Sequence, residues 1–110
     1  MALTGSKQAG STVAALAGKY IKKCMLELGG SDPVIILEDV DIEYAARKAV
    51  ESRLRNSGQA CTNGKRFIIH KSVFEPIKLK MAEILTNEYK VGDPTDKSVK
   101  VGPLARRDLL

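Results

Sequence analysis

Short apolar runs alternate along this chain with longer stretches in which apolar residues recur every three or four positions. The runs at residues 24–28 and 34–37 are nearly continuous, and a glycine pair stops the first of them. Short runs of this kind are typical of buried strands, the first of them buried on both faces, whereas the longer spacing indicates amphipathic helices. The alternation predicts a mixed α/β fold. A chain of 110 residues suffices for one hydrophobic core but not for two well-packed domains.

Three stretches have the helical spacing. They cover residues 6–21, a segment from Asp41 to residues 56–58, and a segment from Ser72 to Glu88. A turn at residues 4–6 would open the first helix, Asp41 would cap the second, and Ser72 with Glu75 would form a capping box for the third. A further strand is expected at residues 66–70. The last twenty residues, with two Gly and two Pro, are predicted to be loop.

Glu27 and Cys61 are the residues whose surroundings suggest chemistry. Glu27 lies between apolar neighbours, where a buried carboxylate can serve as a general base near neutral pH. Cys61 lies in a small polar turn between Gly58 and Gly64, whose backbone N–H groups can stabilise a thiolate or an oxyanion. The alternatives are a strand-end carboxylate in water and a structural thiol. Cys24, inside an apolar run, is predicted to be a core thiol.

Composition argues against several other classes of function. The net charge is +5, but the cations are scattered and Trp is absent, which disfavours nucleic-acid binding. Two cysteines without a Cys-x-x-Cys pair and a single histidine, His70, predict neither a disulfide framework nor a metal site. No signal peptide and no run of 18 apolar residues are present, so we expect a cytoplasmic protein that does not enter a membrane.

Five motifs together resemble the aldehyde dehydrogenase superfamily in order and spacing. They are residues 3–6 (LTGS), 26–33 (LELGGSDP), 56–61 (NSGQAC), 91–94 (VGDP) and 101–104 (VGPL). The resemblance covers essentially the whole chain, although Ser31 replaces the Lys or Asn more usual after the glycine pair. It implies that residues 1–29 are the last helix and strand of a Rossmann-like NAD(P)-binding domain. Residues 30–110 would then open the catalytic domain.

The resemblance also implies the role of each site residue. Cys61 would attack the aldehyde carbon, and its backbone N–H would form half of the oxyanion hole. Glu27 would activate the water that hydrolyses the resulting thioester. The turn at Gly5 and Ser6 would contact the pyrophosphate of the cofactor, NAD or NADP, and the backbone of Leu28 would contact the nicotinamide amide.

Within the superfamily, the chain looks most like succinate-semialdehyde dehydrogenases. The similar segments are residues 22–24, 31–33, 65–69 and 102–106. In such enzymes an Arg at the position of Arg55 can bind the distal carboxylate of the substrate, and a guanidinium fork suits that group. The alternative is a helix-end Arg that faces water.

Because family members are several times longer, the resemblance implies that most of the cofactor site lies outside this chain. We therefore expect it to be inactive alone, to bind dinucleotide poorly, and to associate with itself or with the missing parts of the parent enzyme. One alternative is a non-catalytic folded remnant or interaction module. Another, a thiol hydrolase that uses Cys61 with His70, is disfavoured because no carboxylate evidently orients the histidine.

Overall fold

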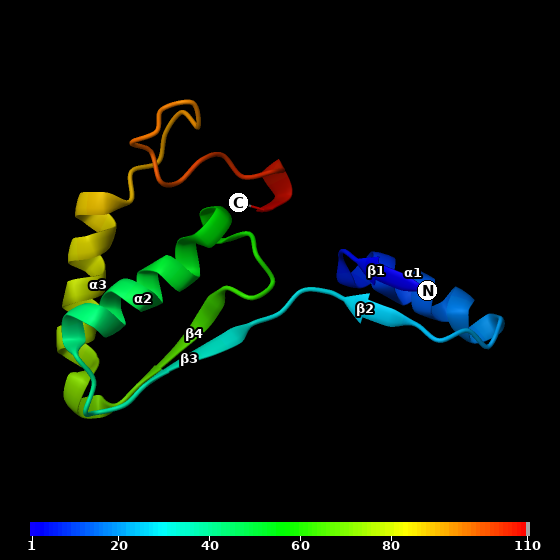
Figure 1. Cartoon of the computed structure of the whole chain (residues 1–110), viewed down its shortest axis with the longest axis horizontal. Coiled ribbons are helices and arrows are strands. Elements are labelled where there is room, and N and C mark those ends of the chain that lie inside the picture. Colours follow the sequence, from blue (N-terminus) through cyan, green and yellow to red (C-terminus); the bar gives the residue numbers. More distant parts are fainter. Residues whose placement is uncertain (110) are drawn as a thin grey trace. The chain divides into compact units, whose positions relative to one another are not determined.

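The computed structural model describes residues 1–109, and the chain forms two compact units that divide between Gly30 and Ser31. The predicted α/β alternation is confirmed (Figure 1). The first unit contains β1 (Ala2–Thr4), α1 (Lys7–Lys19) and β2 (Met25–Glu27). The second contains β3 (Asp32–Ile36), α2 (Ile42–Leu54), a 3-10 turn (Arg55–Gly58), β4 (Gly64–Ile69), a 3-10 turn (Lys71–Val73), α3 (Phe74–Glu88) and a last 3-10 turn (Arg107–Leu109).

The first unit is a parallel β1-α1-β2 arrangement. Strand β1 is missing from the sequence prediction because its three residues are too few to show a pattern. Ser6 begins α1 as predicted, since its side chain accepts a hydrogen bond from the N–H of Ala9 at 3.2 Å. Gly10 lets α1 lie close to the chain after β2, because a Cβ there would be 2.7 Å from both methyl groups of Leu28.

The prediction that the first apolar run is buried on both faces is wrong. Met25 is 63% exposed, and Glu27 and Cys24 are exposed as well. The described residues of this unit include one helix, α1, which can cover only one face of a two-stranded sheet. The apolar run therefore predicts the strand correctly but not its burial. Cys24 is exposed, so the prediction that it is a core thiol is wrong.

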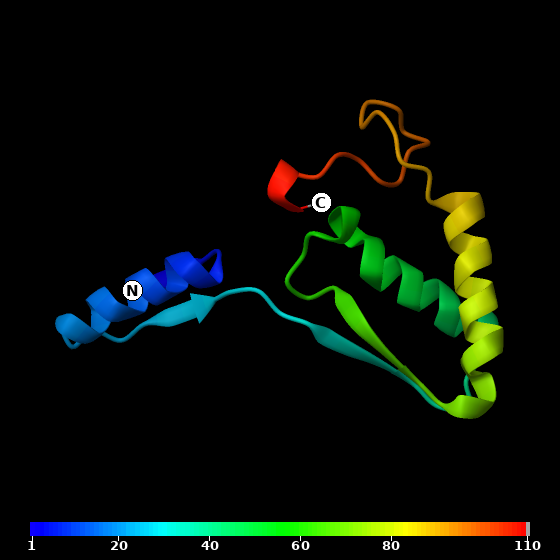
Figure 2. The same cartoon turned by 180° about the vertical axis from the view of Figure 1, so that it is seen from behind.

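In the second unit, α2 packs on one face of the parallel β3–β4 pair, and α3 packs across α2 (Figures 1 and 2). The core consists of Ile36, Ala45, Ala46, Val50, Ile77 and Ile84. Small alanines on α2 let α3 approach closely. Asp41 caps α2 as predicted, because its carboxylate accepts a hydrogen bond from the N–H of Tyr44 at 2.8 Å.

Helix α3 ends at Glu88 as predicted, but its predicted capping box is absent. The helix begins at Phe74 after a 3-10 turn, and its N-cap residue, Val73, makes no side-chain capping bond. The Ser72 hydroxyl instead lies 2.8 Å from Nδ1 of His70, which also accepts a hydrogen bond from the N–H of Ser72. The His70 imidazole thus caps the 3-10 turn, whereas the prediction had Ser72 capping α3.

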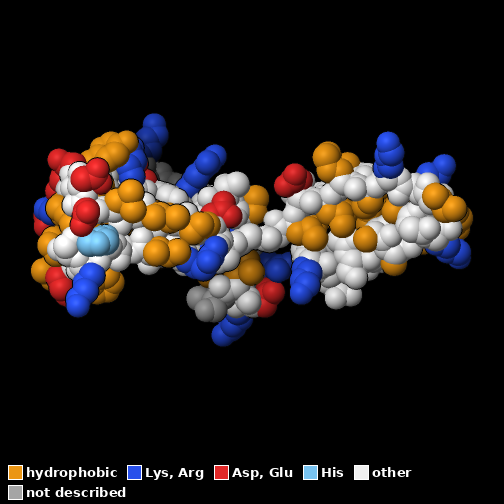
Figure 3. Space-filling model, turned by 90° about the horizontal axis from the view of Figure 1, so that it is seen from below, with side chains coloured by type: hydrophobic (Ala, Val, Ile, Leu, Met, Phe, Trp, Pro, Cys, Tyr) orange, Lys and Arg blue, Asp and Glu red, His pale blue; other side chains and the backbone are white. Residues whose placement is uncertain are grey.

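The outer face of the β3–β4 pair carries exposed apolar side chains. Ile35, Leu37 and Ile68 are each more than half exposed. Figure 3 shows hydrophobic side chains gathered along the second unit. An exposed apolar surface of this kind fits the expectation that the chain associates with other protein, which stays a prediction.

An ion-pair network joins α2, α3 and the segment that follows. Arg47 binds Glu43 at 3.1 Å and Glu88 at 2.9 Å, and Lys100 also binds Glu88, at 3.0 Å. Hydrogen bonds from Lys100 and then from Arg47 lower the pKa of the Glu88 carboxyl. A carboxyl whose pKa is lower in the folded than in the unfolded state stabilises the fold above its unfolded value, about 4.3.

We expect Glu88→Gln to lower the melting temperature at pH 7 and to lose this effect as the pH falls through the lowered pKa of Glu88. As the pH falls toward 3, a growing share of the parent carboxylate is protonated, so the two proteins should melt closer together than at pH 7. Circular dichroism melts at pH 7 and pH 3 measure the difference. Adding NaCl to about 1 M at pH 7 should also reduce it, because salt screens exposed ion pairs. An equal difference at both pH values would assign the effect of Glu88 to packing.

Candidate active-site loop

Cys61 lies in the predicted loop, here residues 56–63, which begins within the 3-10 turn after α2 and ends at the start of β4, and the cysteine is exposed. The loop opens with three consecutive residues in left-handed conformations: Asn56 (φ 52°), Ser57 (φ 56°) and Gly58 (φ 81°). Glycine adopts such angles freely and Asn tolerates them, but Ser pays a conformational cost. The chain reverses here under strain, and Cys61 follows the reversal.

The base of this loop is tied to the end of α2. Asn63 is 1% exposed, and its Nδ2 donates hydrogen bonds to the carbonyls of Arg53 (3.3 Å) and Arg55 (3.0 Å). The N–H of Gly64 donates to the hydroxyl of Ser52 at 3.0 Å. The end of the loop that leads into β4 is therefore fixed to the C-terminal end of α2.

The flank of the loop is held by the segment at residues 102–105. The Ser57 hydroxyl donates to the carbonyl of Gly102 at 3.3 Å and accepts from its N–H at 3.1 Å. Oε1 of Gln59 accepts a hydrogen bond from the N–H of Ala105 at 2.8 Å. The predicted C-terminal loop is thus part of the support for Cys61, which sequence reasoning missed.

A cation lies at the backbone of the turn itself. Nζ of Lys65 donates hydrogen bonds to the carbonyls of Ala60 and Cys61, each at 3.2 Å. Lys65 follows Cys61 by four residues, and only the turn geometry brings its ammonium group back to the cysteine backbone. The turn that carries the thiol is therefore positively charged at its carbonyl side.

Arg55 is exposed and lines an open pocket of about 430 Å³ beside the loop. The other lining residues are Glu51, Leu54, Asn56, Tyr89 and Lys100. Lys100 is paired with Glu88 and Glu51 with Lys48. The pocket thus contains two cationic side chains, one carboxylate and one phenol, and the guanidinium of Arg55 is the group in it that suits a carboxylate ligand.

The other predicted site residues belong to the first unit. The N–H of Gly5 donates to the carbonyl of Glu27 at 3.0 Å, which brings the turn before α1 and the end of β2 together. Ser6 caps α1, and the side chain of Leu28 packs on Gly10. The Glu27 side chain is exposed, which agrees with the alternative of a strand-end carboxylate in water and not with a buried carboxylate. Gly5, Ser6, Glu27 and Leu28 are in one unit, and Cys61 and Arg55 are in the other.

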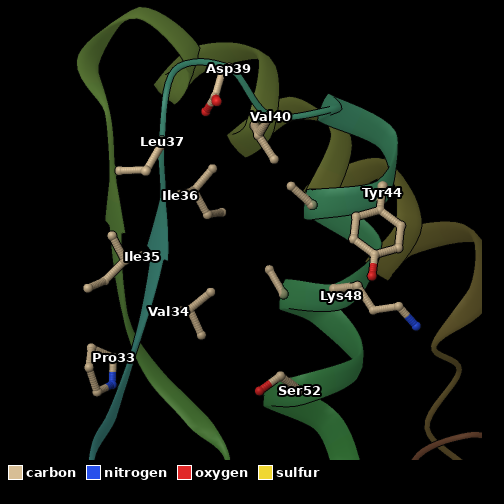
Figure 4. Close-up of a pocket in the computed structure, with 12 residues that line it drawn as sticks. Pro33, Val34, Ile35, Ile36, Leu37, Asp39, Val40, Tyr44, Lys48 and Ser52 are labelled. Carbon is tan, nitrogen blue, oxygen red and sulfur yellow. The ribbon is translucent and has the colours of Figure 1, made fainter.

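A larger cavity, of about 570 Å³, lies between β3 and α2 (Figure 4). Figure 4 shows Val34 and Ile36 pointing from the strand toward the helix, with Ser52 at one end. Its lining is mainly apolar, and none of the predicted site residues contributes to it. Volume alone therefore does not indicate where the chemistry lies.

Gly64, where the loop enters β4, tests how tightly this region is packed. A Cβ at Gly64 would collide with a methyl group of Val34 and lie 3.0 Å from the Ser52 hydroxyl. We expect Gly64→Ala to destabilise the second unit by about 1–3 kcal/mol through overpacking. Gly29→Ala is the matched control, because a Cβ there meets nothing within 4 Å. Urea unfolding measures both, and equal stability of the two variants would contradict the packing argument.

Residues 1–109 contain neither a candidate membrane span nor a candidate metal site. No helix in that range is long and apolar enough to cross a membrane. No three His, Cys, Asp or Glu side chains gather there as ligands for a metal ion.

The fold and the loop geometry place this chain in a known class: it belongs to the aldehyde dehydrogenase family, whose model matches residues 1–109. It is 48% identical over 103 residues to a succinate-semialdehyde dehydrogenase [NADP(+)] of Mycobacterium avium, covering 94% of this chain and 22% of that protein. It is 45% identical over 107 residues to the succinate semialdehyde dehydrogenase [NAD(P)+] Sad of Escherichia coli, covering 97% and 23%.

The solved structures agree with this assignment. The crystal structure of lactaldehyde dehydrogenase from Escherichia coli matches with a TM-score of 0.91 and 34% identity, over 97% of this chain and 22% of that one. The chain therefore spans less than a quarter of the length of the relatives named here. The fold predicted from the sequence, a fragment of the aldehyde dehydrogenase fold, is confirmed.

Proposed function

We propose that this chain carries the nucleophile, Cys61, and the general base, Glu27, of an NAD(P)-dependent aldehyde dehydrogenase that oxidises succinate semialdehyde. The observation that carries the proposal is the exposed thiol of Cys61 on a strained loop fixed at its base by Asn63 and on its flank by residues 102–105. A side chain on a supported loop is preorganised to meet a substrate. The names of the two curated relatives support the choice of substrate and cofactor.

In the proposed reaction, Sγ of Cys61 attacks the aldehyde carbon and forms a thiohemiacetal. The backbone N–H of Cys61 donates a hydrogen bond to the oxyanion that develops. Bound NAD or NADP supplies the acceptor for the hydride, which leaves an acyl thioester on Cys61. Glu27 removes a proton from the water that attacks this thioester, and the products are the carboxylate and the free thiol.

The first unit offers a site that fits part of the cofactor. The turn at Gly5 and Ser6 follows the carboxyl end of β1 and opens α1, and ligands of α/β proteins bind at such ends. Backbone N–H groups at the start of α1 would face the pyrophosphate, while the backbone of Leu28 would contact the nicotinamide amide. On this proposal residues 1–29 belong to the cofactor domain and residues 30–110 to the catalytic domain.

Arg55 would determine the preference for a dicarboxylic product. The other charged side chains of its pocket are already paired, Lys100 with Glu88 and Glu51 with Lys48, so the guanidinium of Arg55 would be the main partner of the distal carboxylate of succinate semialdehyde. An aldehyde without the second carboxylate would gain no binding energy from this pocket.

A nucleophilic thiol also needs a reducing compartment, which favours the cytoplasm.

A chimera tests the proposal. This chain would replace the matching segment of the succinate semialdehyde dehydrogenase Sad of Escherichia coli. The rate of NAD(P)-dependent oxidation of succinate semialdehyde by the chimera would then be compared with its rate of oxidation of butanal. We expect an active chimera, loss of activity in Cys61→Ser, and full activity in the control Cys24→Ser. Arg55→Leu should raise KM for succinate semialdehyde by about tenfold without changing KM for butanal. A folded chimera that stays active in Cys61→Ser would refute the proposal.

A further inference from the structure

We propose that Asn63 is a positioning residue for Cys61, because its side chain closes the base of the loop that carries the thiol. The inference rests on the proposed role of Cys61 as nucleophile. Asn63 itself lies two residues beyond the cysteine and is buried, so it would act through the backbone of the loop and not on the substrate.

The two hydrogen bonds of Asn63 have a particular target. The carbonyls of Arg53 and Arg55 lie at the end of α2, where backbone carbonyls have no partner within the helix. A carboxamide nitrogen has two N–H donors and can satisfy both carbonyls at once. Asp has the same shape but no donors when it is ionised, so it cannot replace Asn here.

The same side chain also carries a cost. Asn63 is the one polar or charged residue that is buried among residues 1–109, and no described group bonds its Oδ1. A buried acceptor without a partner destabilises a fold, and an apolar side chain would avoid that cost. The two donated bonds are therefore the feature that favours Asn at this position.

The loop needs such a clamp because its backbone is strained. Asn56 and Ser57 hold left-handed angles, which persist only where the surrounding structure fixes them. The clamp joins residues 55 and 63, one on each side of residues 56–62, while Ser57 and Gln59 fix the outer flank to residues 102–105. Opening the clamp would let the loop relax, and the backbone N–H of Cys61 would lose its fixed direction.

Hydrogen exchange in the full chain tests the clamp without any enzyme assay. We expect Asn63→Ala and Asn63→Asp to speed amide exchange at residues 59–64 by at least about tenfold, with amides in the middle of α3 unchanged. Val50→Ala is the control, because Val50 is also 1% exposed and lies in α2. It should speed exchange in α2 and α3 as well as in the loop. The same broad pattern in Asn63→Ala would overturn the inference.

The chimera supplies the second readout. If the parent chimera is active, Asn63→Ala should lower kcat by at least about tenfold and leave KM within about twofold, whereas Val50→Ala should keep kcat at a temperature where both are folded. An unchanged kcat in Asn63→Ala would overturn the positioning role. If the parent chimera is inactive, the proposed function fails, and the exchange pattern still decides whether Asn63 clamps the loop.

Discussion

Replacing Ile77 by Ala is expected to destabilise the second unit by about 2–5 kcal/mol, a large part of the stability of a small domain. Ile77 is 0% exposed on α3 and belongs to the core cluster with Ile36, Ala46 and Val50. The alanines of α2 that allow the two helices to approach are already small. They cannot expand to fill the volume that the isoleucine would leave.

Urea unfolding followed by circular dichroism measures this effect, with Leu79→Ala as the control. Leu79 lies two residues further along α3 but is 65% exposed, so its truncation should change stability by less than about 0.5 kcal/mol. Both variants lose aliphatic side-chain atoms from the same helix and differ in burial. Similar losses of stability would mean that Ile77 is not part of a packed core.

The helices of this fold are predictable from the sequence because their signals are local. The apolar stripe after Asp41 and the cap at its start predict α2, and the structure has both. The predicted start of α3 was wrong because His70, which lies outside the expected motif, is the N-cap of the 3-10 turn that precedes the helix. Strand β1 has three residues, and only its pairing with β2, more than twenty residues away, defines it.

For the candidate site too, local features were predictable from the sequence and contacts between distant residues were not. Glycine and small polar residues correctly predicted a loop at Cys61. The bonds that fix this loop join Ser57 to Gly102 and Gln59 to Ala105, and such distant pairs leave no periodic pattern. For Glu27 the sequence left burial and exposure both open, because an apolar run indicates a strand but not how much of the chain covers it, and the structure shows the exposed alternative.

Replacing Glu27 by Gln is expected to separate the two halves of the proposed reaction in the active chimera. Attack by Cys61 and hydride transfer need no base at Glu27, so one equivalent of reduced cofactor should form rapidly. Hydrolysis of the thioester should then be slowed by about 10²–10⁴, the range of a lost general base. Stopped-flow absorbance would follow the burst, and mass spectrometry would detect the succinyl group retained on the peptide that contains Cys61.

Glu75→Gln is the matched control for this experiment. Glu75 is an exposed carboxylate on α3 that pairs with Lys78 and lies outside the candidate site, so its replacement should leave both phases unchanged. If Glu27→Gln turns over at the parent rate, another group is the base. If it produces neither the burst nor turnover while Cys61 still reacts with iodoacetamide, Glu27 acts before the thioester forms. Only a burst followed by slow turnover assigns to Glu27 the water-activating step, because that step alone separates the bound acyl group from the product.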